Sequence, residues 1–444
     1  MRMKSTAWVA ATLFVALAFG MPHASAQDAP APLAIAGQLL DRMDAGEYAQ
    51  AEAMFSADMA AAVPADKLKA VWESLPAQAG AAKRRGEASV DAQGGTELVT
   101  VPLHYEKAEL VAKVAIAGDG KVVGFLIQPA PPPPAAAPAQ DAGFSERDLS
   151  VGEGESALPG TLAMPKGDAP AAGWPAVVLV HGSGPQDRNE AIGPNRPFLD
   201  IARGLAAEGI AVLRYEKRTR ARPQDFAGKA YTIDDETTAD AVAAVAALRA
   251  VEGIDDKRVF VFGHSQGGML APRIATRAIG VAGLVLFAAP ARPLLDILIE
   301  QNVRLAVLDD GKTSDAEKAA IEKLKLQVQA ARKAGDGTTD ALPMGLPASF
   351  WRSTDAVDPV AEAREAALPM LVLQGARDIQ VVDADWQRWR GGFHDDANVE
   401  FKLYETLNHL GIAGEGNGSL AEYGTPGHVD AQLVADVAAW VKAR

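Results

Sequence analysis

Short apolar runs recur through the second half of the chain, and segments with helical spacing separate them. The runs cover residues 176–180, 210–213, 259–262, 281–287, 370–373 and 399–404. Because most of them are apolar at consecutive positions, they indicate strands that are covered on both faces. Helical patterns such as residues 238–248 lie between the runs, as crossover helices of a parallel sheet do. We therefore predict an α/β domain over residues 143–444, with a mostly parallel sheet, helices on both faces, and a starting antiparallel hairpin formed by residues 149–151 and 158–164.

The first part of the chain has a different order of patterns. Apolar residues with nearly helical spacing come first, between residues 33 and 55, and they indicate helices. Alternating strands follow at residues 99–105, 110–116 and 122–127. Helices followed by an antiparallel sheet predict a small α+β domain over residues 27–128, and this order resembles the cone-shaped domains related to nuclear transport factor and ketosteroid isomerase. Such cones can hold a catalytic pocket, but His104 lies within an alternating strand, so we interpret the unit as non-catalytic.

Two segments interrupt these patterns. Residues 129–142 are rich in proline and alanine, which favour extended polyproline geometry and cannot bury a core, so they are predicted to link the two domains. Residues 291–365 fall between two predicted strands of the parallel sheet. Within them, Ser314 and Glu317 have the spacing of a capping box before an apolar stripe. We predict a helical cap over a substrate site, with an additional packed helical layer as the alternative.

The start of the chain has the pattern of an export signal. Arg2 and Lys4 precede an apolar stretch over residues 7–20, and small residues typical of a cleavage site end at Ala26. An uncleaved membrane anchor is the alternative, but Pro22 interrupts the run before it reaches the length of a membrane span. We expect cleavage after Ala26, a mature protein without a membrane span, and a periplasmic or secreted location.

Composition and charge narrow the classes of function. The chain has 444 residues, of which 48% are hydrophobic and 23% charged, as in soluble globular proteins. Its formal net charge is −14, and an acidic surface repels phosphate backbones, so we expect no nucleic-acid partner. The absence of cysteine excludes disulfides, thiolate zinc sites and cysteine nucleophiles. The chemistry must then use oxygen, nitrogen or carboxylate groups, and we expect neither a metal nor an organic cofactor.

The sharpest local motif is Gly263-His264-Ser265-Gln266-Gly267. It directly follows a predicted strand and directly precedes a helical pattern, which is the context of a nucleophile elbow. The small flanking residues allow a tight turn that projects the serine hydroxyl above the sheet. We therefore predict that Ser265 is a catalytic nucleophile.

A serine hydroxyl becomes reactive when a histidine removes its proton and a carboxylate orients that histidine. In α/β-hydrolases the acid and then the histidine follow the serine along the chain. Asp378 comes just after the predicted strand 370–373, and His409 comes after the last strand, 399–404. Both are at carboxyl ends of strands, the edge where open α/β sheets bind ligands. We therefore predict Asp378 as the acid and His409 as the base.

Other residues compete for these two roles. Asp383 and Asp385 remain alternatives for the acid, although neighbouring residues indicate that a helix has begun there. His428 remains an alternative for the base, although it is at the start of a helical pattern. His394 precedes the last strand and so lies at the opposite edge. We interpret His264, the variable position of the elbow, as a packed neighbour.

Acyl transfer also requires hydrogen-bond donors for the oxyanion that develops in the transition state. One donor should be the backbone N–H of Gln266, the residue after the nucleophile. The other should come from residues 181–185, a His-Gly-Ser-Gly-Pro loop directly after the strand 176–180. We predict the N–H of Ser183 for this role, with Gly182 as the second choice.

Longer motifs then support a family resemblance. They comprise residues 181–190 (HGSGPQDRNE), 192–195 (IGPN), 209–215 (GIAVLRY) and 217–219 (KRT). The region from residue 144 to the end of the chain resembles the bacterial esterase D-type α/β-hydrolases. This resemblance implies a serine carboxylesterase that acts on short acyl esters, with Ser265, Asp378 and His409 as its triad. Position 266 is Gln where Leu or Met is common, which changes the side chain but leaves the backbone donor.

Two other functions remain open at this point. A serine peptidase or an acyl-CoA thioesterase could use the same triad, because the fold does not determine the leaving group. A non-catalytic binding protein, with the first domain as its working part, is a more distant alternative. We expect a small-molecule ester as the substrate.

Overall fold

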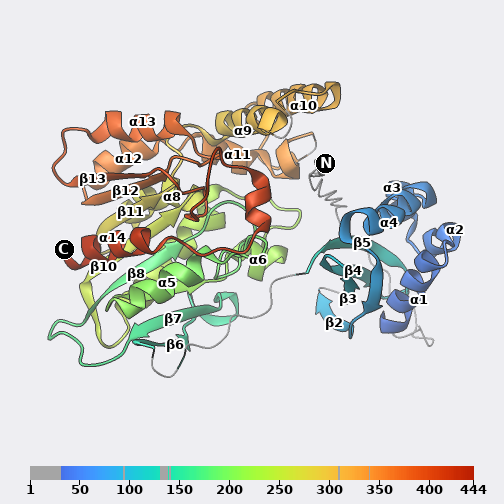
Figure 1. Ribbon diagram of the computed structural model, residues 1–444, viewed down its shortest axis with the longest axis horizontal. Coiled ribbons are helices and arrows are strands. Elements are labelled where there is room, and N and C mark those ends of the chain that lie inside the picture. The colour runs from blue at the N-terminus through green and yellow to red at the C-terminus, as the bar shows by residue number, and fades with distance from the viewer. Residues whose placement is uncertain (1–31, 94–95, 131–138, 140–141, 309–310, 340) are drawn as a thin grey trace. The chain divides into compact units, whose positions relative to one another are not determined.

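A computed structural model describes residues 32–93, 96–130, 139, 142–308, 311–339 and 341–444. The chain forms two compact units, residues 1–133 and residues 134–444, which are considered separately (Figure 1). The predicted export signal, residues 1–26, lies outside the described residues, as does most of the predicted linker. Within the described part of the chain, no helix combines the length and the apolar character needed to span a membrane.

The first unit consists of helices followed by an antiparallel sheet. Its helices are α1 (Pro32–Asp44), α2 (Tyr48–Glu52), α3 (Ala57–Ala62) and α4 (Ala65–Ala79). Its strands are β1 (Ala82–Arg85), β2 (Ser89–Gln93), β3 (Thr96–Tyr105), β4 (Glu109–Ala117) and β5 (Val122–Pro129). The sheet order is β1-β3-β4-β5, and β2 also pairs with β3. This arrangement confirms the predicted small α+β unit.

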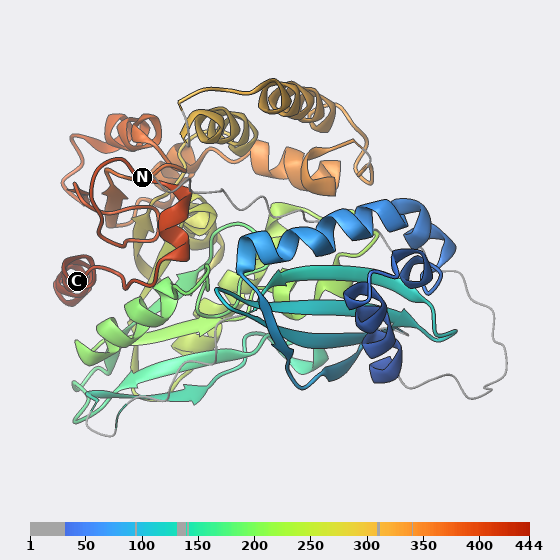
Figure 2. The same cartoon turned by 45° about the vertical axis from the view of Figure 1, so that its right-hand side comes forward.

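Alternation along β3 explains how this unit forms its core. Val99, Val101 and Leu103 are buried because alternate side chains of a strand point to one face of the sheet. Helices α1 and α4 supply the other side of the same core, as the blue ribbons of Figure 2 show. His104 points to the opposite face, where its Nδ1 contacts the carboxylate of Glu109, its neighbour across the β3–β4 register.

The second unit contains an eight-stranded sheet in the order β13-β12-β11-β10-β8-β9-β7-β6. The strands are β6 (Phe144–Asp148), β7 (Gly160–Pro165), β8 (Trp174–Val180), β9 (Ala211–Tyr215), β10 (Ile254–His264), β11 (Val281–Phe287), β12 (Met370–Gly375) and β13 (Val399–Tyr404). The strands from β8 to β13 are parallel to one another, while β7 is antiparallel to both β6 and β9. The predicted mostly parallel sheet is therefore confirmed. The starting hairpin uses β6 rather than residues 149–151, because Val151 forms only an isolated bridge with Leu158.

Helices cover both faces of this sheet, as its apolar strands require. Outside the insertion between β11 and β12, the helices of the unit are α5 (Pro197–Ala207), α6 (Arg218–Ala221), α7 (Ala239–Arg249), α8 (Gln266–Arg277), α13 (Asp383–Phe393) and α14 (Ala431–Lys442), with short turns η1 (Gly154–Ser156), η2 (Pro223–Asp225), η3 (Asp234–Thr238) and η5 (Leu420–Gly424). Helices α5 and α14 lie in front of the sheet in Figure 1 and share one apolar core with it. Helices α7 and α8 pack on the opposite face in a second core. Each central strand therefore contributes alternate residues to two cores.

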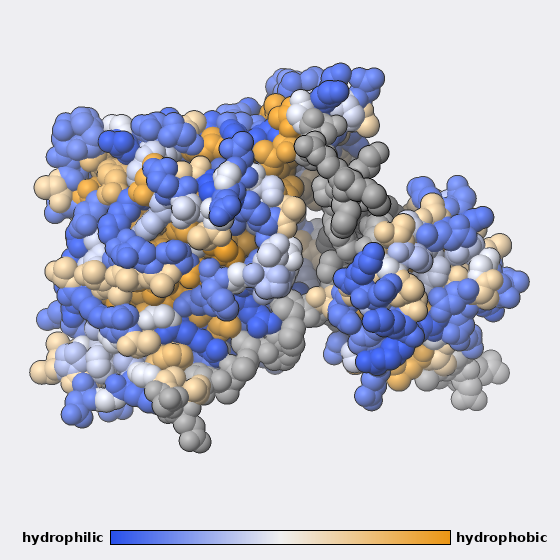
Figure 3. Space-filling model, viewed as in Figure 1, coloured by the Kyte–Doolittle hydropathy of each residue, from blue (hydrophilic) through white to orange (hydrophobic). Residues whose placement is uncertain are grey.

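An insertion of helices separates β11 from β12. It contains α9 (Leu294–Leu308), α10 (Asp315–Ala331), η4 (Pro343–Gly345), α11 (Ala348–Asp355) and α12 (Pro359–Ala366). The capping box predicted from Ser314 and Glu317 is present at the start of α10. Hydrophobic side chains gather over α9 on the face seen in Figure 3. Gln301 of α9 donates a hydrogen bond to the carbonyl oxygen of Gln380 at 3.0 Å, so the insertion contacts the loop that follows β12.

Candidate active site

Ser265 lies on the turn between β10 and α8, in the context that its motif predicts. Its backbone angles are φ 52° and ψ −121°, a conformation that is unfavourable for a residue with a side chain. The turn is held because the N–H of Ser265 donates to the carbonyl oxygen of Phe287 in the next strand, at 2.9 Å. Gly263 and Gly267 allow the tight approach, because a Cβ on either would overlap a backbone carbonyl oxygen. The chain thus stores strain at the residue that we predict to react.

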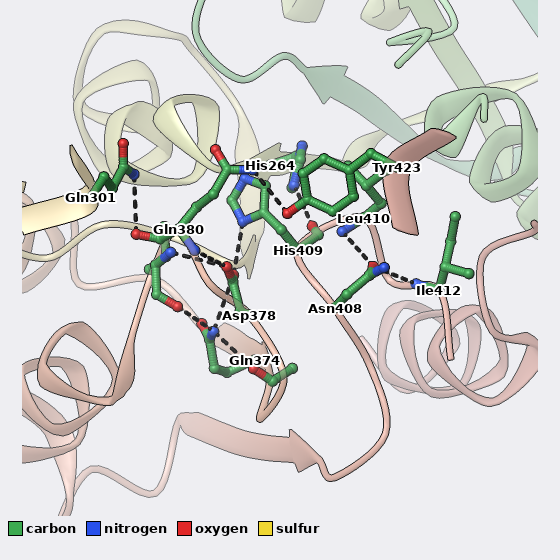
Figure 4. Close-up of polar contacts among 12 residues, drawn as sticks. His264, Gln301, Gln374, Asp378, Gln380, Asn408, His409, Leu410, Ile412 and Tyr423 are labelled. Atoms are coloured by element: carbon green, nitrogen blue, oxygen red, sulfur yellow. Dashed lines mark hydrogen bonds and ion pairs between the residues drawn. The ribbon is translucent and has the colours of Figure 1, made fainter. Parts of the chain in front are cut away.

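Asp378 and His409 come together in the loops that follow β12 and β13. Nδ1 of His409 lies 2.8 Å from Oδ2 of Asp378, and both side chains are buried (Figure 4). The other carboxylate oxygen of Asp378 accepts the N–H groups of Gln380 at 2.7 Å and Val381 at 3.0 Å. These two hydrogen bonds fix the direction of the carboxylate. Because Asp378 takes Nδ1 of His409, Nε2 is the ring nitrogen that can receive a proton.

The alternative acids and bases lie elsewhere. Asp385 is fully buried and pairs with Arg292 at 2.7 Å. Asp383 is exposed and accepts a hydrogen bond from Gln387 within α13. His428 pairs with Asp200 at 3.2 Å and its side chain is 88% exposed, while His394 is an exposed partner of Asp395. In the described residues, none of these groups has a hydrogen bond or ion pair with Ser265, Asp378 or His409.

The loop after β8 runs beside the candidate nucleophile. A Cβ added to Gly182 would lie 3.2 Å from the Cβ of Ser265. Within the described part of the chain, the N–H groups of Ser183 and Gln266 have no acceptor, so both can serve an oxyanion. The N–H of Gly182 instead donates to Oε1 of Glu190 at 2.6 Å. The prediction of Gly182 as the second-choice oxyanion donor is therefore wrong, because its N–H already donates to the carboxylate of Glu190.

His264 is more than the packed neighbour expected from its place in the motif. Its Nδ1 lies 2.8 Å from Oε2 of Glu190, and its Nε2 lies 2.9 Å from the carbonyl oxygen of His409. Both partners accept hydrogen bonds, so both ring nitrogens carry protons and the imidazole is positively charged. Burial by itself would lower the pKa of His264, but the charge of Glu190 and these hydrogen bonds raise it above its usual value.

Glu190 is the functional neighbour that the sequence reasoning missed. Burial would raise the pKa of its carboxyl group, but the charge of His264 and its hydrogen bond hold that pKa below the usual value. The side chain is 1% exposed and joins the loop of Gly182 to the elbow. Its position within the motif run 181–190 was the available signal, because an acidic residue there is otherwise unexplained.

His181 has a different role from its neighbours in this loop. It is buried, and its ring packs near Phe198 and Tyr215 with centroids 5.1 Å and 5.2 Å away. Burial lowers the pKa of His181 to about 4, so the ring is neutral at pH 7. These contacts match a residue that braces the loop.

Comparison with known proteins identifies relatives of both units. Residues 175–415 match the family described as "Serine aminopeptidase, S33", and residues 36–125 match one described as "Protein of unknown function (DUF3887)". The chain is 35% identical over 434 residues to esterase EstD of Thermotoga maritima, covering 97% of this chain and 99% of that protein.

Solved structures similar to this chain include an esterase and a peptidase. An esterase from Pyrococcus furiosus matches with a TM-score of 0.43 and 17% identity, covering 70% of this chain and 97% of the other. A puromycin-hydrolyzing peptidase from Mycobacterium tuberculosis matches with a TM-score of 0.45 and 18% identity, covering 80% of this chain and 47% of the other.

Proposed function

Because the chain belongs to the serine hydrolases of the α/β-hydrolase fold that include esterase EstD, we propose that it is a carboxylesterase acting on short-chain acyl esters. Ser265 is the nucleophile, His409 the general base and Asp378 the residue that orients the base. The observation that carries this proposal is the buried 2.8 Å pair of His409 and Asp378, which occupies loops at the sheet edge where the elbow of Ser265 also lies.

The first half of the reaction follows from these positions. Ser265 Oγ attacks the ester carbonyl carbon while Nε2 of His409 takes the hydroxyl proton. Asp378 stabilises the imidazolium that forms, through the bond to Nδ1. The carbonyl oxygen becomes an oxyanion that accepts hydrogen bonds from the N–H groups of Gln266 and Ser183. The tetrahedral intermediate then collapses, the C–O bond to the alcohol breaks, and His409 returns its proton to the departing alcohol.

Water completes the cycle by the same route. His409 removes a proton from a water molecule as the water attacks the acyl-enzyme carbonyl. The second tetrahedral intermediate uses the same two oxyanion donors. When it collapses, Ser265 regains its proton from His409 and the carboxylic acid is released. No group beyond these side chains and backbone N–H groups takes part in the steps proposed here.

The decisive experiment compares substrates and locates the nucleophile. We expect the purified protein to hydrolyse p-nitrophenyl acetate and butyrate faster than p-nitrophenyl octanoate. A fluorophosphonate probe should label Ser265, as located by mass spectrometry of the digested protein, and Ser265→Ala should remove both labelling and turnover. Labelling at another residue, or full ester turnover by Ser265→Ala, would contradict the assignment.

A peptidase function is the second candidate, because the family matched over residues 175–415 is described as a serine aminopeptidase. Aminoacyl p-nitroanilides test this candidate, and acyl-CoA thioesters test the thioesterase alternative. A kcat/KM for either class above that for the short esters would replace the proposed substrate and leave the triad assignment intact.

We also propose that the protein is exported to the periplasm or secreted. The support is the basic and apolar pattern of residues 1–26 and its small-residue end at Ala26. Expression of the full chain in a Gram-negative host, followed by N-terminal sequencing of the periplasmic protein, should give a mature chain that begins at Gln27. Recovery of the protein in the membrane fraction with residues 1–26 still attached would favour a membrane anchor instead.

A further inference from the structure

A buried lysine lies beside the loop that supplies an oxyanion donor. Lys217 follows β9, and its side chain is 2% exposed. Its Nζ donates to the carbonyl oxygen of Gly182 at 2.9 Å and pairs with Oε1 of Glu236 at 2.7 Å. A buried ammonium is costly unless its hydrogen bonds are satisfied, and an apolar residue of similar size often serves stability as well. The steps of the proposed reaction do not use Lys217, so its position needs another explanation.

The peptide bond between Gly182 and Ser183 provides that explanation. In a trans peptide the carbonyl of one residue and the N–H of the next lie in one plane and point in opposite directions. By holding the carbonyl oxygen of Gly182, Lys217 sets the direction of the Ser183 N–H. A positive charge at the carbonyl also polarises the peptide, which strengthens the N–H as a donor. Glu190 holds the N–H of Gly182 from the other side, so this loop cannot rotate freely.

The same network reaches the second oxyanion donor. Glu236 is 4% exposed, and its Oε2 accepts hydrogen bonds from Nε2 of Gln266 at 2.9 Å and from Oγ1 of Thr237 at 2.5 Å. It lies in η3, a π-helical turn, and such turns occur often at functional sites. Gln266 carries the other donor N–H on its own backbone. A continuous buried chain therefore runs from the Gly182 carbonyl through Lys217 and Glu236 to the side chain of Gln266.

We propose that Lys217 and Glu236 are positioning residues for the oxyanion hole, an inference that rests on the proposed function of this site. They hold the N–H groups of Ser183 and Gln266 in directions that converge on one oxygen atom. Glu236 holds the ammonium group of Lys217 in place, and Gln266 links the pair to the elbow. Gln266 is then part of this hydrogen-bonded chain. The Leu or Met that is common at this position in the esterase D-type hydrolases could not form the hydrogen bond to Glu236.

The test removes the pair without leaving an unpaired buried charge. Lys217→Met/Glu236→Gln keeps the side-chain volumes similar and deletes both charges. We expect kcat for p-nitrophenyl acetate to fall by about 10- to 100-fold while KM stays within about threefold, because misaligned donors weaken the transition state more than the ground state. The affinity of a short alkyl trifluoromethyl ketone, which forms a hemiketal with Ser265, should fall by a similar factor, as measured by ¹⁹F NMR titration.

A matched pair elsewhere in the same unit controls for lost stability. Arg292→Met/Asp385→Asn removes an ion pair whose carboxylate is fully buried and whose guanidinium is 26% exposed. In the described residues this pair has no hydrogen bond to Gly182 or Gln266. We expect this double variant to lower the unfolding temperature while kcat and ketone affinity stay within about twofold, as for structural ion pairs remote from the reacting atoms. Equal losses of kcat in both double variants would reduce Lys217 and Glu236 to a structural role.

Gln266→Leu decides the question if the first double variant does not fold. It deletes the link to Glu236 without removing a charge. A fall of about threefold or more in kcat and in ketone affinity, with KM unchanged, would support the chain, since misdirected donors lose transition-state binding. Unchanged kcat and ketone affinity would overturn it.

The two proposals fail in different ways. A parent protein that binds the ketone but does not hydrolyse esters would contradict the ester substrate, and the ketone affinities of the variants would still decide the positioning role. A folded parent that binds neither ester nor ketone would overturn both proposals.

Discussion

Glu190 and His264 form a buried ion pair, with 2.8 Å between Oε2 of Glu190 and Nδ1 of His264. His264 directly precedes the candidate nucleophile, Ser265. The second oxygen of Glu190 accepts the N–H of Gly182, and the second nitrogen of His264 donates to the carbonyl of His409. Three loops that are far apart in the sequence are therefore joined through two side chains. The pair connects the loop of Gly182, the elbow of Ser265 and the loop of His409.

The Glu190–His264 pair should give stability a distinct pH dependence. The pKa of His264 lies above its usual 6.5 and that of Glu190 below its usual 4.5. The contribution of His264 is therefore fully present below pH 6.5 and is lost as pH rises through its raised pKa. The contribution of Glu190 is present above pH 4.5 and is lost as pH falls through its lowered pKa.

Glu190→Gln isolates this effect. Without the carboxylate, burial remains as the main influence on His264 and lowers its pKa, so protonating the ring would now destabilise the fold. We expect the free energy of unfolding lost in the variant to be larger at pH 6 than at pH 9, as measured by urea denaturation at each pH. His428→Gln, which changes an exposed ring, should leave this difference near zero. A loss that does not depend on pH would contradict a charged His264.

Asp378→Asn and Asp385→Asn should separate the two roles that an acidic residue can have here. Replacing Asp378 leaves the volume of the side chain but weakens the orientation of His409, so we expect kcat to fall by about 10⁴-fold with folding retained. Asp385 holds Arg292 and the N–H of Ala291, so its replacement should lower the free energy of unfolding and leave kcat nearly unchanged. Steady-state kinetics and thermal unfolding of both variants measure this. The reverse pattern would transfer the acid role to Asp385.

The backbone strain at Ser265 should be visible in stability. Its positive φ of 52° suits glycine, which lacks a Cβ, better than any other residue. Both Ser265→Ala and Ser265→Gly should lose at least about 10⁴-fold in kcat, because each removes the nucleophile. We expect Ser265→Gly to be more stable to urea than Ser265→Ala by about 1 kcal/mol, since it relieves the strain. Equal stabilities would indicate that the turn relaxes in solution.

Gly267→Ala should show how tightly the elbow packs on the neighbouring strand. A Cβ there would overlap the carbonyl oxygen of Val180 in β8, so we expect a loss of about 3 kcal/mol in the free energy of unfolding. Gly37→Ala is the matched control, because nothing lies within 4 Å of its added Cβ and alanine favours a helix. Urea denaturation should show no loss for the control. A tolerated alanine at position 267 would mean that α8 can move away from β8.

Local patterns were enough to predict most of the fold. Continuous apolar runs identify strands such as β8 and β10, because a strand covered on both faces needs no polar side. The starting hairpin was misplaced because β6, with the sequence FSERD, is polar at most positions and lies at the edge of the sheet. Its hydrogen bonds to β7 and the pairing of Glu146 with Arg203 and Arg214 hold it there, and neither has a periodic signal.

The sequence by itself determined the turn at Ser265 and the order of the predicted acid and histidine after it. Glycine spacing and the ends of strands can be recognised from neighbouring residues, so neither requires the tertiary structure. Only the tertiary structure decided which groups engage the Gly182 peptide: Glu190 takes its N–H, and Lys217, 35 positions along the chain, takes its carbonyl. The ring of His264 likewise meets Glu190 across 74 positions. Such pairings depend on how deeply each side chain is buried and where it points after folding. The sequence shows that a residue is charged, but it does not show whether that charge is buried or exposed to water.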